Sequence, residues 1–467
     1  MKNENKISLK KPLGLFSLVM INVIAVDNLR SLTAGAEYGF ALIFFYLIAS
    51  LFFFLPLILV SAELATGWPS TGGAYIWIRE AFGTRVGFFA IWLQWIYNVV
   101  WYPTIFTFIG GLFAYLILPQ LVNNKFFMVG MILSLFWGVT FINYLGIKAS
   151  SWVSTVGALI GTLLPMILII ILGYIWIDRG KPSQIQFSLK SFFPSFSDFN
   201  NLAFLTNVFF GLMGIEMSAV HAGDVKNPRQ NYPRALFLSA IIILITLIFS
   251  CLAIAIVIPQ SKLNLVSGFM DAFHVFFNAY HLTWLTSWIA LFVIMGSLSG
   301  ASAWIIGSAR GLFIASQDNQ LPAFLTHVNK KNMPTGILLM QGLIVTVLCL
   351  LFLIMPSMNS AYWVLANLTA QLALLFYILV FAASIRLRYQ HAKVKRAFHI
   401  PGGLPMMWAI SGVGMITCFF AILIGFLPPT QIAIGGIAKY EIVLSAGILL
   451  CCLPPFLWKT TSEMTTQ

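Results

Sequence analysis

The most informative part of the sequence is the segment Asn207-Val-Phe-Phe-Gly-Leu-Met-Gly-Ile-Glu-Met-Ser-Ala-Val220. It is apolar enough to lie in a lipid bilayer, yet it carries Gly211, Gly214 and the carboxylate of Glu216 near its middle. A charged side chain near the bilayer centre costs roughly 2.5–3.5 kcal/mol even on mild insertion scales, and glycine weakens a helix. The segment therefore predicts a transmembrane helix that is broken here and lines a binding site.

The composition sets the class of protein around this segment. Of 467 residues, 60% are hydrophobic and only 8% are charged, which is typical of a polytopic membrane protein. The net charge of +13 does not indicate nucleic-acid binding, because the basic residues lie in short loops between apolar runs. All five cysteines lie inside apolar runs, so we expect small buried side chains and no disulfide framework.

We predict twelve transmembrane helices, each close to the roughly 20 residues that a bilayer requires. They occupy residues 13–34, 39–62, 86–118, 126–146, 151–177, 201–223, 235–258, 283–308, 335–355, 360–385, 407–428 and 440–458. Nineteen of the 26 lysines and arginines then lie on the N-terminal side of the membrane, six lie on the other side, and Arg30 lies within the first span. This asymmetry predicts that both termini, residues 1–12 and 459–467, are cytoplasmic.

The first span has an interruption of its own, from Asp27 to Thr33. Asp27 and Arg30 are three residues apart, so on a continuous helix they would share a face and could pair, which would lower the cost of inserting both. The alternative is that the helix simply ends there, but the interruption follows only about fourteen apolar residues, too few to cross the bilayer.

Two interrupted spans, the first and the sixth, stand five spans apart. This is the pattern of an inverted-repeat transporter that binds its substrate at the breaks. Backbone N–H groups at one half-helix end attract a carboxylate, and carbonyls at the other accept from an ammonium group. The pattern therefore predicts a site for a zwitterionic amino acid.

A sodium-coupled symporter and an intramembrane enzyme are two alternative classes of protein. A sodium-coupled symporter would use oxygen ligands such as Ser299 and Ser302, although serines in membrane helices also serve packing. An intramembrane enzyme needs a convergent catalytic set, but the six histidines lie mostly near loops and no metalloprotease or nucleophile motif occurs. We expect no enzymatic activity, catalytic residue, metal site or cofactor.

Several segments together resemble the amino acid–polyamine–organocation superfamily, and within it the bacterial glutamate/γ-aminobutyrate antiporter group. These segments are Pro69–Trp77, Met213–Glu216, Asp224–Arg234, Trp304–Gly311, Leu321–Ala323 and Phe398–Gly403. The resemblance implies an all-α, LeuT-type fold with two inverted five-helix repeats, at 13–177 and 201–385, in which helices 1 and 6 are broken. Two extra helices at 407–458 complete the expected fold.

The resemblance also implies roles for single residues. It places Ile24 and Asp27 at the unwound part of the first span, and Phe210 and Met213 beside the substrate, with Phe210 as a lid. It makes Glu216 the span-6 glutamate, for which we predict a coupling role by protonation. The structural alternative is a Glu216 that only bridges helices through hydrogen bonds.

Trp304 matches an aromatic gate on span 8, and Tyr377 matches a tyrosine on span 10. The breaks themselves add Asn28, Arg30 and Gly214. The expected substrate-binding set is Ile24, Asp27, Asn28, Arg30, Phe210, Met213, Gly214, Trp304 and Tyr377, with Glu216, Phe210 and Trp304 as coupling or gating residues.

The chain also departs from the glutamate exchangers. These carry aromatic residues in the first span where this chain has Asp27–Arg30, and Ala373 stands where they have an aromatic residue. Their long C-terminal plug and its pH switch are not expected here. The resemblance implies a secondary transporter of amino acids or related amines in the bacterial inner membrane, working by alternating access as an antiporter, with protons as possible partners. A sodium- or proton-coupled symporter is the alternative.

Overall fold

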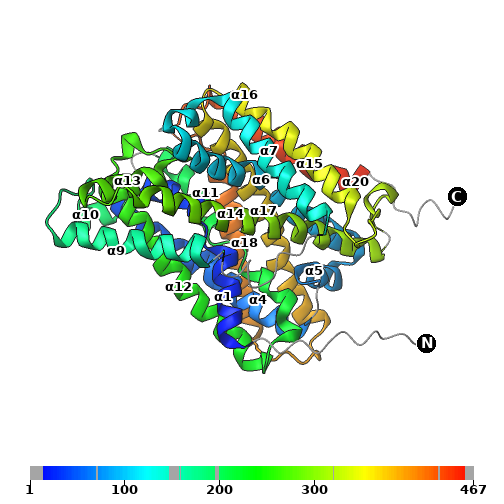
Figure 1. Ribbon diagram of the computed structural model, residues 1–467. Coiled ribbons are helices and arrows are strands. Elements are labelled where there is room, and N and C mark those ends of the chain that lie inside the picture. Colours follow the sequence, from blue (N-terminus) through cyan, green and yellow to red (C-terminus); the bar gives the residue numbers. More distant parts are fainter. Residues whose placement is uncertain are drawn as a thin grey trace.

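The computed structural model describes residues 14–69, 72–146, 157, 159–194, 199–318, 320–429 and 432–457. Apart from isolated bridge residues, at Val225 and in the pair Val328–Pro334, its regular structure in these ranges is helical (Figure 1). A helix satisfies all of its backbone hydrogen bonds within one segment, and lipid offers no alternative partners. The expectation of an all-helical membrane protein is confirmed.

Ten helices in the described part of the chain are long and apolar enough to cross a membrane. They span Gly39–Gly67 (containing α3, Leu42–Ala49, and α4, Leu55–Gly67), Thr84–Ile117 (α6), Lys125–Tyr144 (α7), Leu159–Asp178 (ending in α9, Leu164–Asp178), Leu202–Ala219 (containing α11, Leu205–Gly211), Gln230–Val257 (within α12, Pro228–Val257), Leu285–Ile314 (α14), Thr335–Ile354 (α15, Thr335–Cys349, and α16, Leu351–Ile354), Met358–Gln390 (α17) and Gly403–Gly425 (α18). A bent pair, Leu15–Val26 (α1) with Leu29–Ala36 (η1 and α2), makes an eleventh candidate.

The twelfth expected span corresponds to α19, Ile437–Cys452. With 16 residues it is shorter than the others, and Leu453 and the prolines at the start of α20 (Pro454–Leu457) follow it directly. Proline cannot continue the hydrogen-bond ladder of a helix. The described residues thus provide ten or eleven spans where the sequence predicts twelve, and the predicted start of the fifth span, 151–156, lies outside them.

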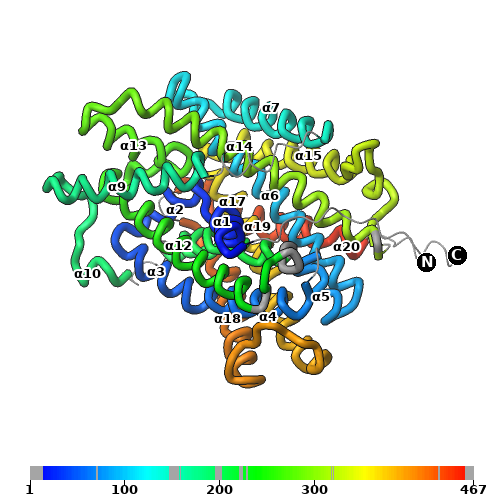
Figure 2. Tube along the Cα trace, turned by 60° about the horizontal axis from the view of Figure 1, so that its bottom comes forward, coloured from blue at the N-terminus to red at the C-terminus, as the bar shows by residue number. Residues whose placement is uncertain are grey.

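The broken helices lie inside the bundle. α1 packs against α12 and against η7 (Ile215–Asp224), while α6 packs against both α14 and α17. Figure 2 shows α18 beside α4, on the side of the bundle away from α7 and α15. Large apolar side chains are exposed on the outer helices, among them Phe126, Tyr174, Ile416 and Leu450. Such exposure suits a protein surrounded by lipid.

Two glycines allow the fifth span to approach α14 closely. A Cβ atom added to Gly161 would lie 2.4 Å from the Gly296 Cα atom, and one added to Gly296 would lie 2.5 Å from the Gly161 Cα atom. Small residues at such crossings let membrane helices pack backbone to backbone. This crossing brings Thr162 and Gly296 to the wall of the central cavity described below.

Candidate functional site

The first span is broken between Val26 and Leu29. Asp27 and Asn28 are extended, with ψ angles of 120° and 131°, and the two helical pieces meet at a bend of 41°. The Asn28 amide nitrogen donates to the Val26 carbonyl (3.1 Å), while its oxygen accepts from the Ser31 N–H (3.0 Å). The predicted interruption is confirmed, and the helix resumes to Ala36 rather than ending at an interface.

The sixth span is broken at Leu212–Gly214, between α11 and η7. Gly214 has a φ of +108°, a backbone conformation that side chains with a Cβ rarely adopt. Its N–H donates to the Tyr377 hydroxyl (3.0 Å), and a Cβ atom placed on it would lie 3.5 Å from the Ala25 carbonyl oxygen. The two breaks therefore lie against each other.

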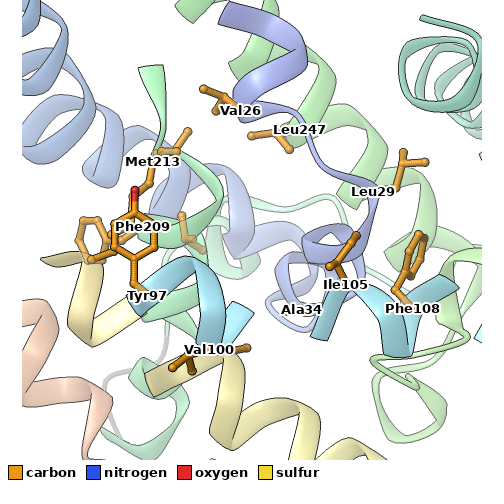
Figure 3. Close-up of a cluster of buried hydrophobic side chains, with 14 of the residues drawn as sticks. Val26, Leu29, Ala34, Tyr97, Val100, Ile105, Phe108, Phe209, Met213 and Leu247 are labelled. Atoms are coloured by element: carbon orange, nitrogen blue, oxygen red, sulfur yellow. The ribbon is translucent and has the colours of Figure 1, made fainter. Parts of the chain in front are cut away.

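A cavity of about 120 Å³ opens where the breaks meet. Figure 3 shows apolar side chains around this region, with Leu29 beside Ile105 and Phe108 of α6. The lining residues are Ile24, Ala25, Val26, Asp27, Asn28, Leu29, Arg30, Tyr97, Asn98, Trp101, Ile105, Phe108, Thr162, Phe210, Met213, Gly214, Gly296, Ser297, Gly300, Ala301 and Trp304. Every predicted substrate-binding residue except Tyr377 lies on this wall.

Arg30 is a buried cation in the cavity wall that has no ion-pair partner among the described residues. Its side chain is 2% exposed, and its Nε has no hydrogen-bond partner there. Its guanidinium lies 4.9 Å from the centre of the Phe210 ring, and its Nη1 donates to the Tyr362 hydroxyl at 3.3 Å. A buried, unpaired charge costs several kcal/mol unless a ligand completes it.

Asp27 does not pair with Arg30, which corrects the expectation from their spacing. Its two carboxylate oxygens accept from the Thr246 hydroxyl of α12, at 3.2 and 2.9 Å. The reason is the break itself: the helix ends at Val26, so residues 27 and 30 do not lie one turn apart on a common helical face. The cavity therefore presents an acid and a base that are each bound to uncharged protein groups.

Glu216 and Tyr377 lie behind the cavity rather than on its wall. The Tyr377 hydroxyl donates to Glu216 Oε2 (2.9 Å) and also accepts from the Gly214 N–H. Glu216 is 2% exposed, and its Oε1 has no partner in the described chain. Tyr377 thus connects the span-6 break to the buried carboxylate.

Trp304 lies on the cavity wall, as the sequence suggested for an aromatic residue deep inside a span. Its ring lies 6.1 Å from that of Trp101, and its backbone carbonyl accepts from the Tyr102 hydroxyl at 3.0 Å. Ser302 is not a wall residue: its hydroxyl donates to Asn143 of α7 at 3.3 Å. Ser299 is also absent from the wall, so neither proposed sodium ligand faces the cavity.

The sequence analysis missed the contribution of α6. Tyr97, Asn98, Trp101, Ile105 and Phe108 all come from this helix. The available signal was the amide side chain of Asn98, in a span that also carries Gln94, three tryptophans and three tyrosines. Tyr362 and Thr246, which hold the two charged residues, had no recognisable local signal.

Comparison with known proteins identifies the family. The amino acid permease family matches residues 13–448. An uncharacterized transporter of Legionella pneumophila is 53% identical over 449 residues, 96% of this chain and 97% of the relative. A glutamate/gamma-aminobutyrate antiporter of Lactococcus lactis is 32% identical over 97% of this chain and 90% of the relative. A probable agmatine/putrescine antiporter of the same species is 26% identical, covering 90% of this chain and 89% of that relative.

The expectation of a transporter, rather than an enzyme, is confirmed by these matches. The resemblance drawn from the six segments between Pro69 and Gly403 is confirmed as well. The chain belongs to the amino acid permease family of multi-pass membrane transporters.

Proposed function

We propose that this protein exchanges amino acids across the bacterial inner membrane by alternating access, as a secondary active antiporter. In this proposal helices 13–177 and 201–385 form two inverted repeats, 407–458 adds two helices, and both termini are cytoplasmic. The observation that carries the proposal is the cavity at the two helix breaks, whose wall contains the buried ionisable side chains of Arg30 and Asp27.

The substrate chemistry follows from these two charges. The Ser31 N–H is already bound to Asn28 and the Gly214 N–H to Tyr377, so these two backbone donors are not free for a substrate carboxylate. Arg30 takes that role, because a guanidinium matches a carboxylate in shape and charge. Asp27 accepts the substrate ammonium group. This arrangement favours amino acids over diamines, which would bring a second cation towards Arg30.

Exchange rather than net transport follows from the cost of the empty cavity. The cavity must close to both sides of the membrane each time the transporter changes between its outward-open and inward-open states. Without a substrate carboxylate, the enclosed Arg30 charge remains unpaired, and that raises the free energy of the closed empty state. The loaded carrier avoids this cost and therefore reorients faster than the empty one.

Three residues have supporting roles in the proposal. Phe210 closes over the substrate as a lid, since it lies on the cavity wall and stacks against the Arg30 guanidinium. Trp304 acts as the aromatic gate on the α14 side. Glu216 exchanges a proton and transmits its state to the span-6 break through Tyr377.

Counterflow in proteoliposomes tests the proposal. Vesicles containing the purified protein are loaded with an unlabelled amino acid, and uptake of the same labelled amino acid is measured in sodium and in choline buffers. We expect uptake to require internal amino acid and to be equal in both buffers. Uptake into empty vesicles that depends on a sodium gradient would identify a sodium-coupled symporter. Uptake into empty vesicles that depends on a proton gradient would identify a proton-coupled symporter.

A further inference from the structure

A second cavity, of about 370 Å³, lies apart from the central one and shares no residue with it. It lies where the end of α2, the segment after α12, the start of α17 and the segment before α19 meet. Its lining residues are Glu37, Gln260, Ser261, Leu263, Leu265, Ser357, Asn359, Ile432 and Ala433. Five of its nine lining residues carry a side-chain oxygen atom.

Among the described residues of this wall, Glu37 is the one ionisable group. Its side chain is 6% exposed, and its Oε2 atom is buried with no hydrogen-bond partner in the described chain. The Gln260 amide donates to the Glu37 backbone carbonyl (3.0 Å). No basic side chain of the described residues forms an ion pair with the Glu37 carboxylate.

A second acceptor in the wall of this pocket is unsatisfied too. The Asn359 Oδ1 atom, in the first turn of α17, is buried without a partner. The neighbouring Ser357 hydroxyl is occupied, because it bonds to the Ser360 hydroxyl (2.6 Å) and accepts from the Ser360 N–H (3.1 Å). Two unsatisfied acceptors thus line one pocket, and buried acceptors without donors are rare in folded proteins.

The charge state of Glu37 fits a pocket that awaits a cation. Burial raises the pKa of the Glu37 carboxyl to about 8, and the nearby Gln260 side chain offsets only part of this effect. An arriving cation would stabilise the ionised form, because an opposite charge at contact distance favours it.

The pocket lies next to the central cavity along two elements. Asn359 precedes Tyr362, the hydrogen-bond partner of Arg30, by three residues on α17, which is about 4.5 Å of helix rise. Glu37 follows Arg30 at the end of the same short helical segment. The contact between Arg30 and Tyr362 is therefore near the second pocket in sequence on both elements.

We propose that this pocket binds the primary ammonium group of a small amine or amino acid, between the Glu37 carboxylate and the Asn359 side-chain oxygen. An ammonium group has three donors, which suits two carboxylate or amide acceptors and a serine hydroxyl such as that of Ser261. A bare divalent metal ion fits less well, because it requires six or more closely placed oxygens and the pocket offers one carboxylate. The site goes beyond the proposed exchange and does not depend on it.

Calorimetric titration with butylamine hydrochloride tests the site in the purified full-length protein. The titration uses an Asp27→Asn background, which removes the acid of the central cavity, and compares it with the Asp27→Asn/Glu37→Gln double variant. We expect butylamine to bind the single variant and to bind the double variant at least about tenfold more weakly. Equal binding by the two variants would overturn the proposal, as would the absence of binding to the folded Asp27→Asn protein.

Asn359→Leu provides a second test of the site, because it removes the second acceptor and leaves Glu37 itself unchanged. We expect it to weaken butylamine binding in the same background, and unchanged binding would contradict the assignment of Asn359. Titrations in 200 mM sodium chloride and in 200 mM choline chloride, on the order of physiological ionic strength, distinguish a site for an ammonium group from a site for a sodium ion. Displacement of butylamine by sodium alone would show an alkali-ion site and overturn the assignment to an ammonium group.

Discussion

The buried charges around the central cavity and those at the end of α4 are arranged in opposite ways. In the α4 cluster, Glu63 is 1% exposed and receives two hydrogen bonds from Arg388, each 2.5 Å long. It also lies 3.4 Å from Arg396 and accepts from the Ile400 N–H at 2.8 Å. In the central cavity, Arg30 has only aromatic rings and one long hydrogen bond from its Nη1 to a tyrosine.

The difference separates charges that hold the fold from charges that await a ligand. Glu63 joins α4, α17 and the segment leading to α18, so its partners are supplied by the chain itself. Arg30 has no such partner, and the carboxylate of a substrate would complete its surroundings. Changing a charge in the α4 cluster should therefore affect stability, and changing the Arg30 charge in the central cavity should affect transport.

The largest effect on stability is expected for Glu63→Gln. Removing the carboxylate leaves Arg388 and Arg396 close together without a counter-ion, and breaking a buried ion pair costs about 3–5 kcal/mol. We expect a strongly lowered unfolding temperature in detergent. Glu80→Gln, at a half-exposed position on α5 (Ala74–Phe82), is the matched control and should change stability by less than about 0.5 kcal/mol. Equal unfolding temperatures for the two variants would refute the structural role of Glu63.

Arg30→Gln should produce the opposite pattern. It removes the group that binds the substrate carboxylate, and losing a buried charged partner typically costs about 2–5 kcal/mol of binding, or at least about thirtyfold in exchange at low substrate concentration. Because the charge has no counter-ion in the described part of the chain, its removal should not lower the unfolding temperature. Exchange in proteoliposomes at wild-type rates would remove Arg30 from the binding site.

The double variant Asp27→Asn/Arg30→Gln sharpens the same comparison. If the two residues formed an ion pair, removing both would restore part of the activity lost by removing Arg30 alone. The structure gives them separate partners, Thr246 and Tyr362, so we expect exchange no faster than in the worse single variant. Recovery of exchange in the double variant would indicate a direct pair during the transport cycle.

Glu216→Gln is expected to have a smaller effect on substrate binding and a specific effect on pH dependence. The glutamine retains an acceptor for Tyr377 but cannot change its charge. Exchange rates measured from pH 5 to pH 8, about the range over which proton-coupled groups titrate, should lose a step that the wild type shows. Identical pH profiles would support the structural alternative, in which Glu216 only joins helices through hydrogen bonds.

The smallest effect is expected at Asp318, which bonds to Arg79 at 3.0 Å and to Tyr75, and whose side chain is 21% exposed. Burial alone would raise its pKa, but the Tyr75 and Arg79 contacts outweigh burial and lower the pKa of Asp318. Ionised Asp318 therefore stabilises the folded protein at neutral pH. This stabilisation begins to be lost as pH falls below about 4, the pKa of an unperturbed aspartate, and is gone once pH falls below the lowered pKa of Asp318 in the folded protein. Asp318→Asn should cost about 1 kcal/mol or less at pH 7, with the difference disappearing in acid; a constant difference would contradict this.

The two helix breaks were predictable because glycine and charge are rare inside membrane spans. Gly214, Glu216 and the residues Asp27–Arg30 each differ from the apolar sequence around them. The structure places the breaks where these residues lie. The pairing of Asp27 with Arg30 was wrong because the spacing rule assumes a continuous helix. Inside a break the backbone is extended, so sequence separation no longer determines which side chains share a face.

Other features had no signal that a single sequence provides. Most residues of α6 are buried against other helices, so the polar Asn98 alone does not show which face of α6 lines the cavity. Glu63 and Arg388 are 325 residues apart, and no local pattern connects such positions. Their contact depends on how α4 and α17 pack, which only the folded chain reveals.

The most direct test of the account is the thermal unfolding of the wild type and of Arg30→Gln, each with and without the amino acid that the exchange assay identifies. We predict that the ligand raises the unfolding temperature of the wild type, since a ligand that binds only the folded state stabilises it. Arg30→Gln should be at least as stable as the ligand-free wild type and should show no shift with ligand. A variant that is less stable than the wild type and still responds fully to the ligand would contradict the claim that Arg30 is held unpaired for the substrate.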